Sequence, residues 1–391
     1  MRATRLVVAY ATLMLLAGGA QAADHITIGY STTLTGPLAV EGEQMVNAFS
    51  LALEHLDNKL GGLPATLVIA DDQAKPQVGV QNAHRLLERD KADLLAGMLL
   101  SNVTEAILNA VLPEGAAVIA SGGVPAPYAG KDCSRNFIST FWNTDTPYEQ
   151  IGLYLKRQGI KRPYVIGLNV QPGRDALNGF KLGMGGEMAG ETYTRVDQSE
   201  FASELTDIRR VAPDAVVWFN PGGTGIAFLK QYVQAGLINS VPLYGMTIQT
   251  DESKFPALGD AAIGVKSVGN WSPELDNDSN RHFVAAYRAK YGRLPTTLGA
   301  MAYDNALLID AAVRAVGGDL SDKAKLVAAA RRADFASVRG KIRFNNNNVP
   351  IQNFYLNVVE KGPDGVLRNK LAATVASEVS DPHAKDCPLT W

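Results

Sequence analysis

Ala215-Val-Val-Trp-Phe219 is an uninterrupted apolar run, and Asn220-Pro-Gly-Gly223 and a helical stretch at 224–235 come directly after it. Five apolar residues in succession predict a strand buried on both faces, because a half-exposed strand alternates apolar and polar residues. The proline and the two glycines predict the end of the strand and the turn into the helix. A buried strand followed by a single helix is the repeating unit of an α/β protein with a parallel sheet.

The same unit recurs in two series along the 391-residue chain, which is long enough for two or three domains. The first series has predicted strands at 25–30, 66–70, 94–100 and 117–120. The second starts after Trp142, with predicted strands at 164–168, 215–219 and 241–245. Residues 277–333 are predicted to be mostly helical with a break at Pro295, and strands at 340–344 and 354–359 close the chain. We therefore predict two doubly wound sheets, each covered by helices on both faces.

The first 23 residues have the pattern of a secretory signal peptide. Arg2 and Arg5 precede an apolar run at 6–16, and Ala20-Gln-Ala22 is a small-x-small cleavage site. The run is shorter than the ~20 residues of a membrane-spanning helix, so a retained anchor is the weaker alternative. We expect cleavage of residues 1–23 and export to the periplasm.

The composition argues against several kinds of partner. The formal charge is −2 for the full chain and about −4 without the first 23 residues, which gives no electrostatic basis for binding nucleic acid or anionic lipid. Cys133 and Cys387 are the only cysteines. An isolated pair in an oxidising compartment favours a disulfide, with two free thiols as the alternative. The five histidines are scattered, so we expect no metal site.

The sequence contains none of the common catalytic signatures, such as G-x-S-x-G, H-E-x-x-H or a phosphate-binding loop. The segment 223–228 follows a strand and opens a helix, as a dinucleotide-binding turn does, but Phe228 stands where that motif has Gly or Ala. We therefore expect no cofactor. Asp71 and Asp72 are interpreted as solvated residues at a strand end, and a glycosidase-type carboxylate pair stays open as the alternative.

Small polar residues and glycines gather where predicted strands end and helices begin. They are Thr32, Thr33, Ser101, Asn102, Ser121, Gly122, Gly123, Gly222, Gly223, Thr224 and Thr247. In doubly wound sheets, ligands bind beyond the carboxyl ends of the strands, where helix N-termini present free N–H groups that suit a carboxylate. The alternative is that these residues only cap helices and form turns, and Asn102 and Glu105 do fit a capping box. Because several such junctions occur in one chain, we predict a cleft for a small anion.

Several segments, in their order and spacing, resemble one known family. They are Ile26-Thr-Ile-Gly-Tyr-Ser-Thr-Thr-Leu-Thr-Gly-Pro37, Asn58-Lys-Leu-Gly-Gly62, Ala70-Asp-Asp-Gln73, Phe219-Asn-Pro-Gly-Gly223 and Tyr287-Arg-Ala-Lys-Tyr-Gly292. Over nearly all of residues 24–359 the chain is similar to periplasmic solute-binding proteins of the branched-chain amino-acid (Leu/Ile/Val) binding family, which serve ABC importers.

The resemblance implies a type I periplasmic-binding fold, in which two Rossmann-like lobes are joined by three crossovers and close on a ligand. It places the crossovers near 142–143, 271–272 and 344–345. Lobe 1 then comprises 24–143 plus 272–344, and lobe 2 comprises 144–271 plus 345–391.

The resemblance also implies a set of ligand-binding residues in both lobes. They are Ser101, Ser121, Gly122, Gly123, Gln171, Gly222, Gly223 and Thr247. Ser101 matches a serine whose hydroxyl binds the ligand carboxylate, and 121–124 matches a second carboxylate-binding turn in which Val124 replaces a hydroxyl residue. Gln171, Gly222 and Gly223 match the facing wall of lobe 2. Thr247 lies where the amino-acid binders have a glutamate that pairs with the ligand ammonium.

Because an unpaired buried ammonium is costly, the absence of this glutamate argues against an α-amino acid. The turn at 219–225 and the late Cys387 are similar to the branch of the family that binds aromatic acids. The main interpretation is a monomeric solute-binding component that carries a small carboxylate, such as a hydroxybenzoate or hydroxycinnamate, to a membrane ABC permease complex. A branched-chain or other amino-acid binding protein, a secreted hydrolase or lyase, and a ligand-sensing subunit are the alternatives.

Overall fold

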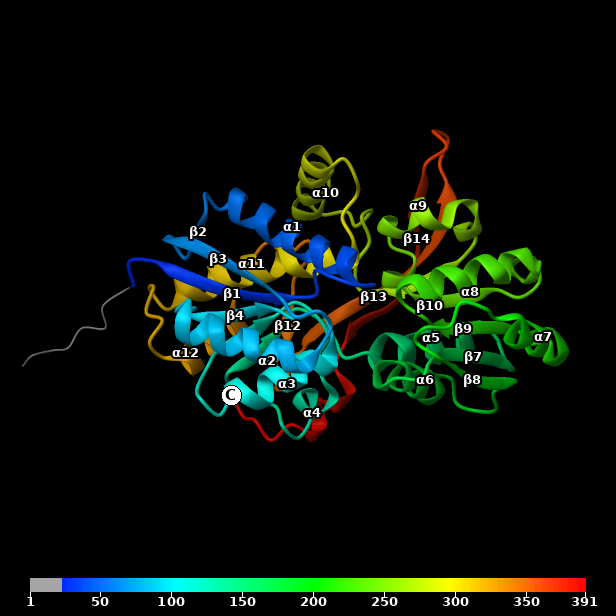
Figure 1. Cartoon of the computed structure of the whole chain (residues 1–391), viewed down its shortest axis with the longest axis horizontal. Coiled ribbons are helices and arrows are strands. Elements are labelled where there is room, and N and C mark those ends of the chain that lie inside the picture. The colour runs from blue at the N-terminus through cyan, green and yellow to red at the C-terminus, as the bar shows by residue number, and fades with distance from the viewer. Residues whose placement is uncertain (1–22) are drawn as a thin grey trace, which may run out of the picture.

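The computed structural model describes residues 23–391, which form two β-sheets with helices on both faces of each (Figure 1). The first sheet and its helices occupy the left half of Figure 1, and strands β7 to β10 (residues 163–246) of the second sheet lie in the right half. Apart from Ala23, the predicted signal peptide lies outside the described residues and stays a prediction.

Six strands form the first sheet. Their order is β2 (Lys59–Leu60), β3 (Leu63–Asp71), β1 (Ile26–Thr32), β4 (Leu94–Gly97), β5 (Val118–Ala120) and β6 (Phe137–Ser139). All neighbours from β3 to β6 are parallel, whereas β2 pairs antiparallel with β3.

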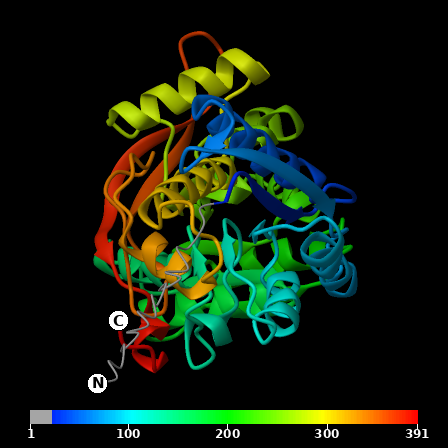
Figure 2. The ribbon, with the colours of Figure 1, turned by 90° about the vertical axis from the view of Figure 1, so that its left-hand side faces the viewer.

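Alternate residues of β4 point into two different cores, as the period of a strand requires. Leu94 and Ala96 pack in the core beneath α1 (Ala39–His55) and α11 (Thr297–Ala315). Leu95 packs in the opposite core, beneath α2 (Pro76–His84) and α3 (Ser101–Val111). In Figure 2 the gold helix α11 and the cyan helices lie on opposite sides of the blue strands. The predicted burial of this sheet on both faces is confirmed.

Eight strands form the second sheet. Their order is β12 (Arg343–Phe344), β13 (Pro350–Lys361), β11 (Lys266–Gly269), β10 (Leu243–Met246), β9 (Ala215–Phe219), β7 (Pro163–Leu168) and β8 (Gly190–Thr194), with β14 (Leu367–Val379) paired to β13. The neighbours from β11 to β8 are parallel, and β13 pairs antiparallel with β11, β12 and β14. Val217 of β9 packs beneath α5 (Asp145–Arg157) and α6 (Gln171–Met184), whereas Val216 packs beneath α7 (Ala202–Val211) and α8 (Gly222–Gln234).

The predicted strand at 215–219 is β9 with the same bounds, and the predicted helical region at 277–333 forms α10 (Asp278–Tyr291), α11 and α12 (Lys323–Arg332). Two short helices are α4 (Ala126–Ala129) and α9 (Phe255–Leu258). Strands β6, β8, β11 and β14 are not among the predicted elements. The capping box at Asn102 and Glu105 is wrong, because α3 already begins at Ser101 and its N-cap residue is Leu100.

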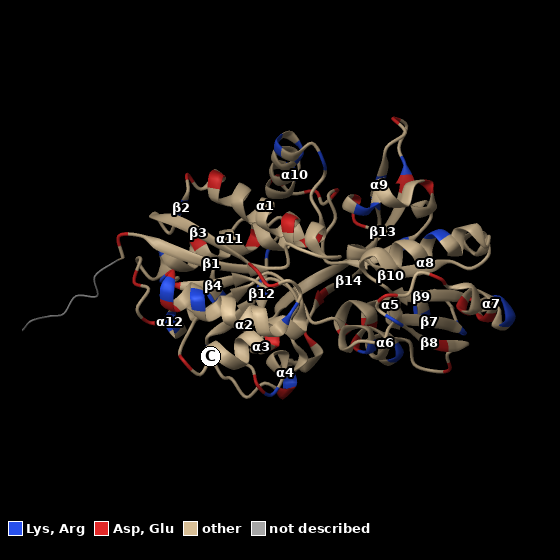
Figure 3. Ribbon diagram, in the orientation of Figure 1, with Lys and Arg blue, Asp and Glu red and all other residues tan. Residues whose placement is uncertain are grey.

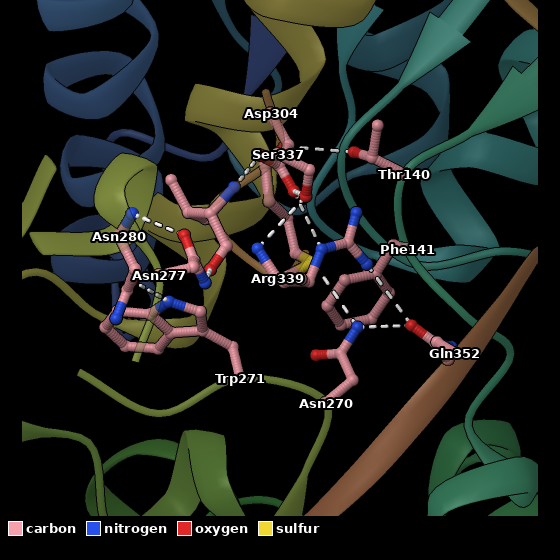
Figure 4. A network of polar contacts seen from close by, with 12 residues as sticks. Thr140, Phe141, Asn270, Trp271, Asn277, Asn280, Asp304, Ser337, Arg339 and Gln352 are labelled. Atoms are coloured by element: carbon pink, nitrogen blue, oxygen red, sulfur yellow. Dashed lines mark hydrogen bonds and ion pairs between the residues drawn. The ribbon is translucent and has the colours of Figure 1, made fainter. Parts of the chain in front are cut away.

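Three segments run between the two halves, at 140–144, 270–277 and 333–349, and the predicted crossover positions fall within them. The predicted lobe boundaries stay a prediction. A buried polar network joins these segments, as Figure 4 shows. Asp304 of α11 accepts hydrogen bonds from Ser337 Oγ (2.7 Å) and Arg339 Nε (2.8 Å). Arg339 Nη1 donates to Gln352 Oε1 (3.2 Å), which also accepts from Asn270 of the second crossover.

The predicted disulfide between Cys133 and Cys387 is present, and it holds the C-terminal tail against the first half of the molecule. Within this tail, Thr390 O accepts a hydrogen bond from Arg135 Nη2 (2.7 Å), and the guanidinium groups of Arg135 and Arg331 lie 4.9 and 5.0 Å from the centre of the Trp391 ring. The predicted boundaries assign residues 381–391 to lobe 2, but these contacts place the tail with the elements of the first sheet.

Candidate functional site

A cavity of about 430 Å³ lies between the two halves, beside the first crossover. Its lining residues come from the starts of α3, α5 and α6 and from the segment that includes α4. They are Ser101, Asn102, Glu105, Val124, Pro125, Ala126, Pro127, Asn143, Thr144, Asp145, Gln171 and Asp175. This volume is within the usual range for small-molecule sites.

Ser101 is the first residue of α3, directly beyond the carboxyl end of β4. The first backbone hydrogen bond of this helix runs from Thr104 N to Leu100 O (2.8 Å). The amides of 101–103 therefore precede the intrahelical ladder, and together with the Ser101 hydroxyl they form a donor group at the positive end of the helix. This arrangement suits the carboxylate of a ligand.

The turn at Ser121, Gly122 and Gly123 supports this helix start. The Ser121 and Gly123 amides donate to Gly97 O (2.9 Å) and Leu99 O (3.1 Å), and Ser121 Oγ lies 3.3 Å from the Tyr30 hydroxyl. A Cβ at Gly122 would lie 1.8 Å from Met98 O, so only glycine allows the close approach. These contacts orient the segment that carries Ser101. That the turn itself binds the ligand stays a prediction.

Gln171 begins α6 and faces the same cavity from the second half. Its Nε2 donates to Asp175 Oδ1 (2.7 Å), one turn further along the helix. Burial raises the pKa of Asp175, and the Gln171 hydrogen bond opposes this shift. The structure thus brings together Ser101 and Gln171, two of the residues predicted from opposite lobes.

Gly222, Gly223 and Thr247 do not line this cavity. Gly222 has φ +68° at the start of α8, and a Cβ there would lie 3.8 Å from Pro37 O of the first half. Thr247 is buried, and its Oγ1 would lie 2.3 Å from a Cβ at Gly269. Their predicted ligand contacts remain predictions.

Three further side chains that line the cavity are carboxylates, and none of them is among the predicted site residues: Glu105, Asp145 and Asp175. Glu105 and Asp175 each follow a predicted site residue by four positions, so the helical i, i+4 spacing was a signal that could have found them. Asp145 Oδ2 lies 2.6 Å from His383 Nε2, a pair 238 residues apart in sequence, for which no local signal exists. This hydrogen bond raises the pKa of His383.

A second set of contacts joins the two halves outside the cavity. Asp251 accepts hydrogen bonds from the Thr297 amide (3.3 Å) and hydroxyl (3.1 Å) at the start of α11. Close by, the buried side chains of Lys254 and Glu41 form an ion pair. These contacts tie the segment after β10 to α1 and α11, which cover the first sheet.

Burial raises the pKa of Asp251 to about 8. Because the folded protein holds this proton more tightly than the unfolded chain, the free energy of unfolding decreases as pH rises from about 4 to about 8. Burial raises the pKa of Glu252 to about 7, which also makes the free energy of unfolding decrease as pH rises. Asp251→Asn keeps a side-chain oxygen as an acceptor for Thr297 but cannot ionise. We expect the free energy of unfolding of this variant, relative to that of wild type, to be higher at pH 8 than at pH 5. Urea midpoints at both pH values test this, and an equal difference at both would contradict it.

Among residues 23–391, no cluster of His, Cys, Asp and Glu has metal-site geometry, and no helix is long and apolar enough to cross a membrane. Acidic and basic residues are mixed over the elements of both halves (Figure 3).

Comparison with known proteins gives a consistent result. A family model described as "Periplasmic binding protein" matches residues 25–364. Leu/Ile/Val-binding protein homolog 6 of Brucella melitensis is 29% identical over 387 residues, which cover 95% of this chain and 96% of that protein. Leu/Ile/Val-binding protein BraC3 of Rhizobium johnstonii is 27% identical over 68% of this chain and 72% of its own length.

Two solved structures of ABC-transporter solute-binding proteins from Rhodopseudomonas palustris superpose with TM-scores of 0.85 and are each 28% identical. One is a complex with benzoate and covers 92% of this chain and 98% of its own. The other is a complex with 3,4-dihydroxybenzoic acid and covers 92% and 99%. A leucine-binding protein from Thermotoga maritima, at 18% identity and a TM-score of 0.80, shares the fold. The predicted type I fold, with two Rossmann-like lobes and three crossovers, is confirmed.

Proposed function

Because the chain belongs to the periplasmic binding protein family, we propose that it is the extracytoplasmic solute-binding component of an ABC importer and that it carries a small aromatic carboxylate. The similarity to the benzoate and dihydroxybenzoate complexes supports this ligand class. In this proposal, lobe 1 (24–143 plus 272–344) and lobe 2 (144–271 plus 345–391, apart from the tail) close on the ligand. The protein is a monomer, exported by cleavage of residues 1–23, that delivers its ligand to a membrane permease.

The observation that carries this proposal is the pairing of a donor-rich helix start with an apolar wall in one cavity. The Ser101 hydroxyl and the first amides of α3 suit a carboxylate. The segment Val124 to Pro127 lines the same cavity with apolar side chains, against which a flat ring can be buried. A hydroxyl residue at position 124 would give a polar wall instead.

The test is calorimetric titration of wild type and Ser101→Ala with 4-hydroxybenzoate, benzoate and leucine. We expect wild type to bind 4-hydroxybenzoate, and Ser101→Ala to bind it about 10- to 150-fold more weakly, since a hydrogen bond to a charged group contributes ~1.5–3 kcal/mol. Tight leucine binding without any response to the aromatic acids would contradict the ligand assignment.

A second candidate is amino-acid binding, which the Leu/Ile/Val-binding relatives favour. The carboxylates of Glu105 and Asp175 are the groups in the cavity that could pair with an ammonium. The leucine arm of the same titration decides between the two. A hydrolase or lyase would be revealed by chromatography of the aromatic ligand after incubation, and we expect the ligand to be recovered unchanged.

A further inference from the structure

Both sides of the cavity carry hydrogen-bonding groups, and each includes a carboxylate, Glu105 on the α3 side and Asp175 on the α6 side. On the side of α3, the Ser101 hydroxyl and the helix amides can donate hydrogen bonds. On the side of α6, Nε2 of Gln171 donates to Asp175 Oδ1, and the backbone amides of residues 171 and 173 precede the first hydrogen bond of the helix, from Arg174 N to Val170 O. Within residues 23–391, Gln171 Oε1 and Asp175 Oδ2 have no hydrogen-bond partner. As long as the Asp175 carboxyl group is ionised, both oxygens can accept a hydrogen bond but neither can donate one.

The described residues that line the cavity include Glu105, Asp145 and Asp175 but no Lys, Arg or His. Asp145 is hydrogen-bonded to His383, which does not line the cavity. Asp175 is hydrogen-bonded only to the neutral Gln171 amide, and the nearby basic side chains of Arg174 and His383 make no hydrogen bond to it. With the ligand carboxylate at Ser101, Asp175 is the carboxylate on the opposite side that can accept a hydrogen bond from the ligand.

We propose that Asp175 is a specificity-determining residue, which accepts a hydrogen bond from a ring hydroxyl at the end of the ligand distant from its carboxylate. The site then prefers hydroxylated aromatic acids to the unsubstituted acid. This rests on the proposed binding of aromatic carboxylates. Without a donor on the ligand, the partly buried Asp175 loses solvent on closure and gains no partner, which is the costly case for a charged group.

The preference is measured as the ratio of the dissociation constants of benzoate and 4-hydroxybenzoate, with 4-methoxybenzoate as a ligand of similar shape that lacks the donor. We expect wild type to prefer 4-hydroxybenzoate to both others by about 10- to 150-fold, as for a hydrogen bond to a charged group. Asp175→Asn keeps the side-chain shape but removes the charge, and it should lose most of this ratio. Asp175→Glu keeps the carboxylate and should retain a preference.

Glu105→Gln is the matched control, because it removes one carboxylate from the same cavity on the α3 side. It should leave the ratio unchanged and strengthen the binding of all three acids, since a like charge near their carboxylates is removed. Unfolding midpoints confirm that each variant is folded. A wild-type ratio near one, or an unchanged ratio in Asp175→Asn, overturns the role of Asp175 while aromatic acids still bind. Absence of binding by all three acids overturns the proposed function together with this inference.

Discussion

Replacing Cys133 and Cys387 together by Ala is expected to lower the free energy of unfolding by on the order of 4–5 kcal/mol. The two cysteines are 254 residues apart, so the disulfide closes a very long loop and strongly restricts the unfolded chain. The folded protein also loses order in the tail, whose contacts with Arg135 and Arg331 depend on its tether. Urea unfolding followed by tryptophan fluorescence measures the change.

Wild type in a strong thiol reductant serves as the control and should unfold at the same urea concentration as the double variant. The single variants should match the double variant, because each removes the same cross-link. Equal stability of oxidised wild type and the double variant would contradict the expectation.

The second large effect is expected at the buried ion pair between Arg339 and Asp304. Arg339→Met leaves the Asp304 carboxylate buried without its cation and should lower the free energy of unfolding by about 3–5 kcal/mol. Asp304 retains hydrogen bonds from Ser337 Oγ (2.7 Å) and the Val338 amide (2.9 Å), which satisfy its oxygens but do not neutralise it. Urea unfolding again provides the measurement.

Arg343→Met is the matched control. Arg343 lies only four residues after Arg339, but it is exposed and pairs with the exposed Glu378. An exposed pair contributes about 0–1 kcal/mol, so this variant should stay close to wild type. The double variant Asp304→Leu with Arg339→Met should recover part of the loss, because neither charge is then left unpaired. Equal effects of Arg339→Met and Arg343→Met would show that the buried pair is no more important than a surface pair.

The sequence predicts the central strands well because their residues are buried on both faces. β9 has the predicted bounds since all five of its residues are apolar and Pro221 follows closely. In contrast, β14 mixes exposed residues such as Lys370, Thr374 and Glu378 with half-buried and buried ones, and its stability comes from pairing with β13, which no local pattern reports. β6 and β11 are as short as β4 and β5, which are predicted, but polar residues interrupt their apolar runs: Ser139 ends β6, and Lys266 and Ser267 begin β11.

The sequence predicts those residues of the candidate site that directly follow the carboxyl ends of strands. Ser101 and Gln171 follow strand ends, so the rule for doubly wound sheets places them at the cleft. Which atoms are free for a ligand depends on tertiary contacts. The buried Ser121 hydroxyl lies against Tyr30, and Gln171 is bound to Asp175, and neither contact follows from spacing alone.

The C-terminal tail has a mechanical consequence. After β14 the chain passes Asn143, whose side chain donates to Asp381, and ends at the disulfide on the first half. The tail is therefore a fourth covalent link between the lobes, beside the three crossovers. This fourth link limits torsion and sliding of one lobe against the other. In the closure proposed above, Ser101 and Asp175 would therefore keep a more constant register in the oxidised protein than in the reduced protein.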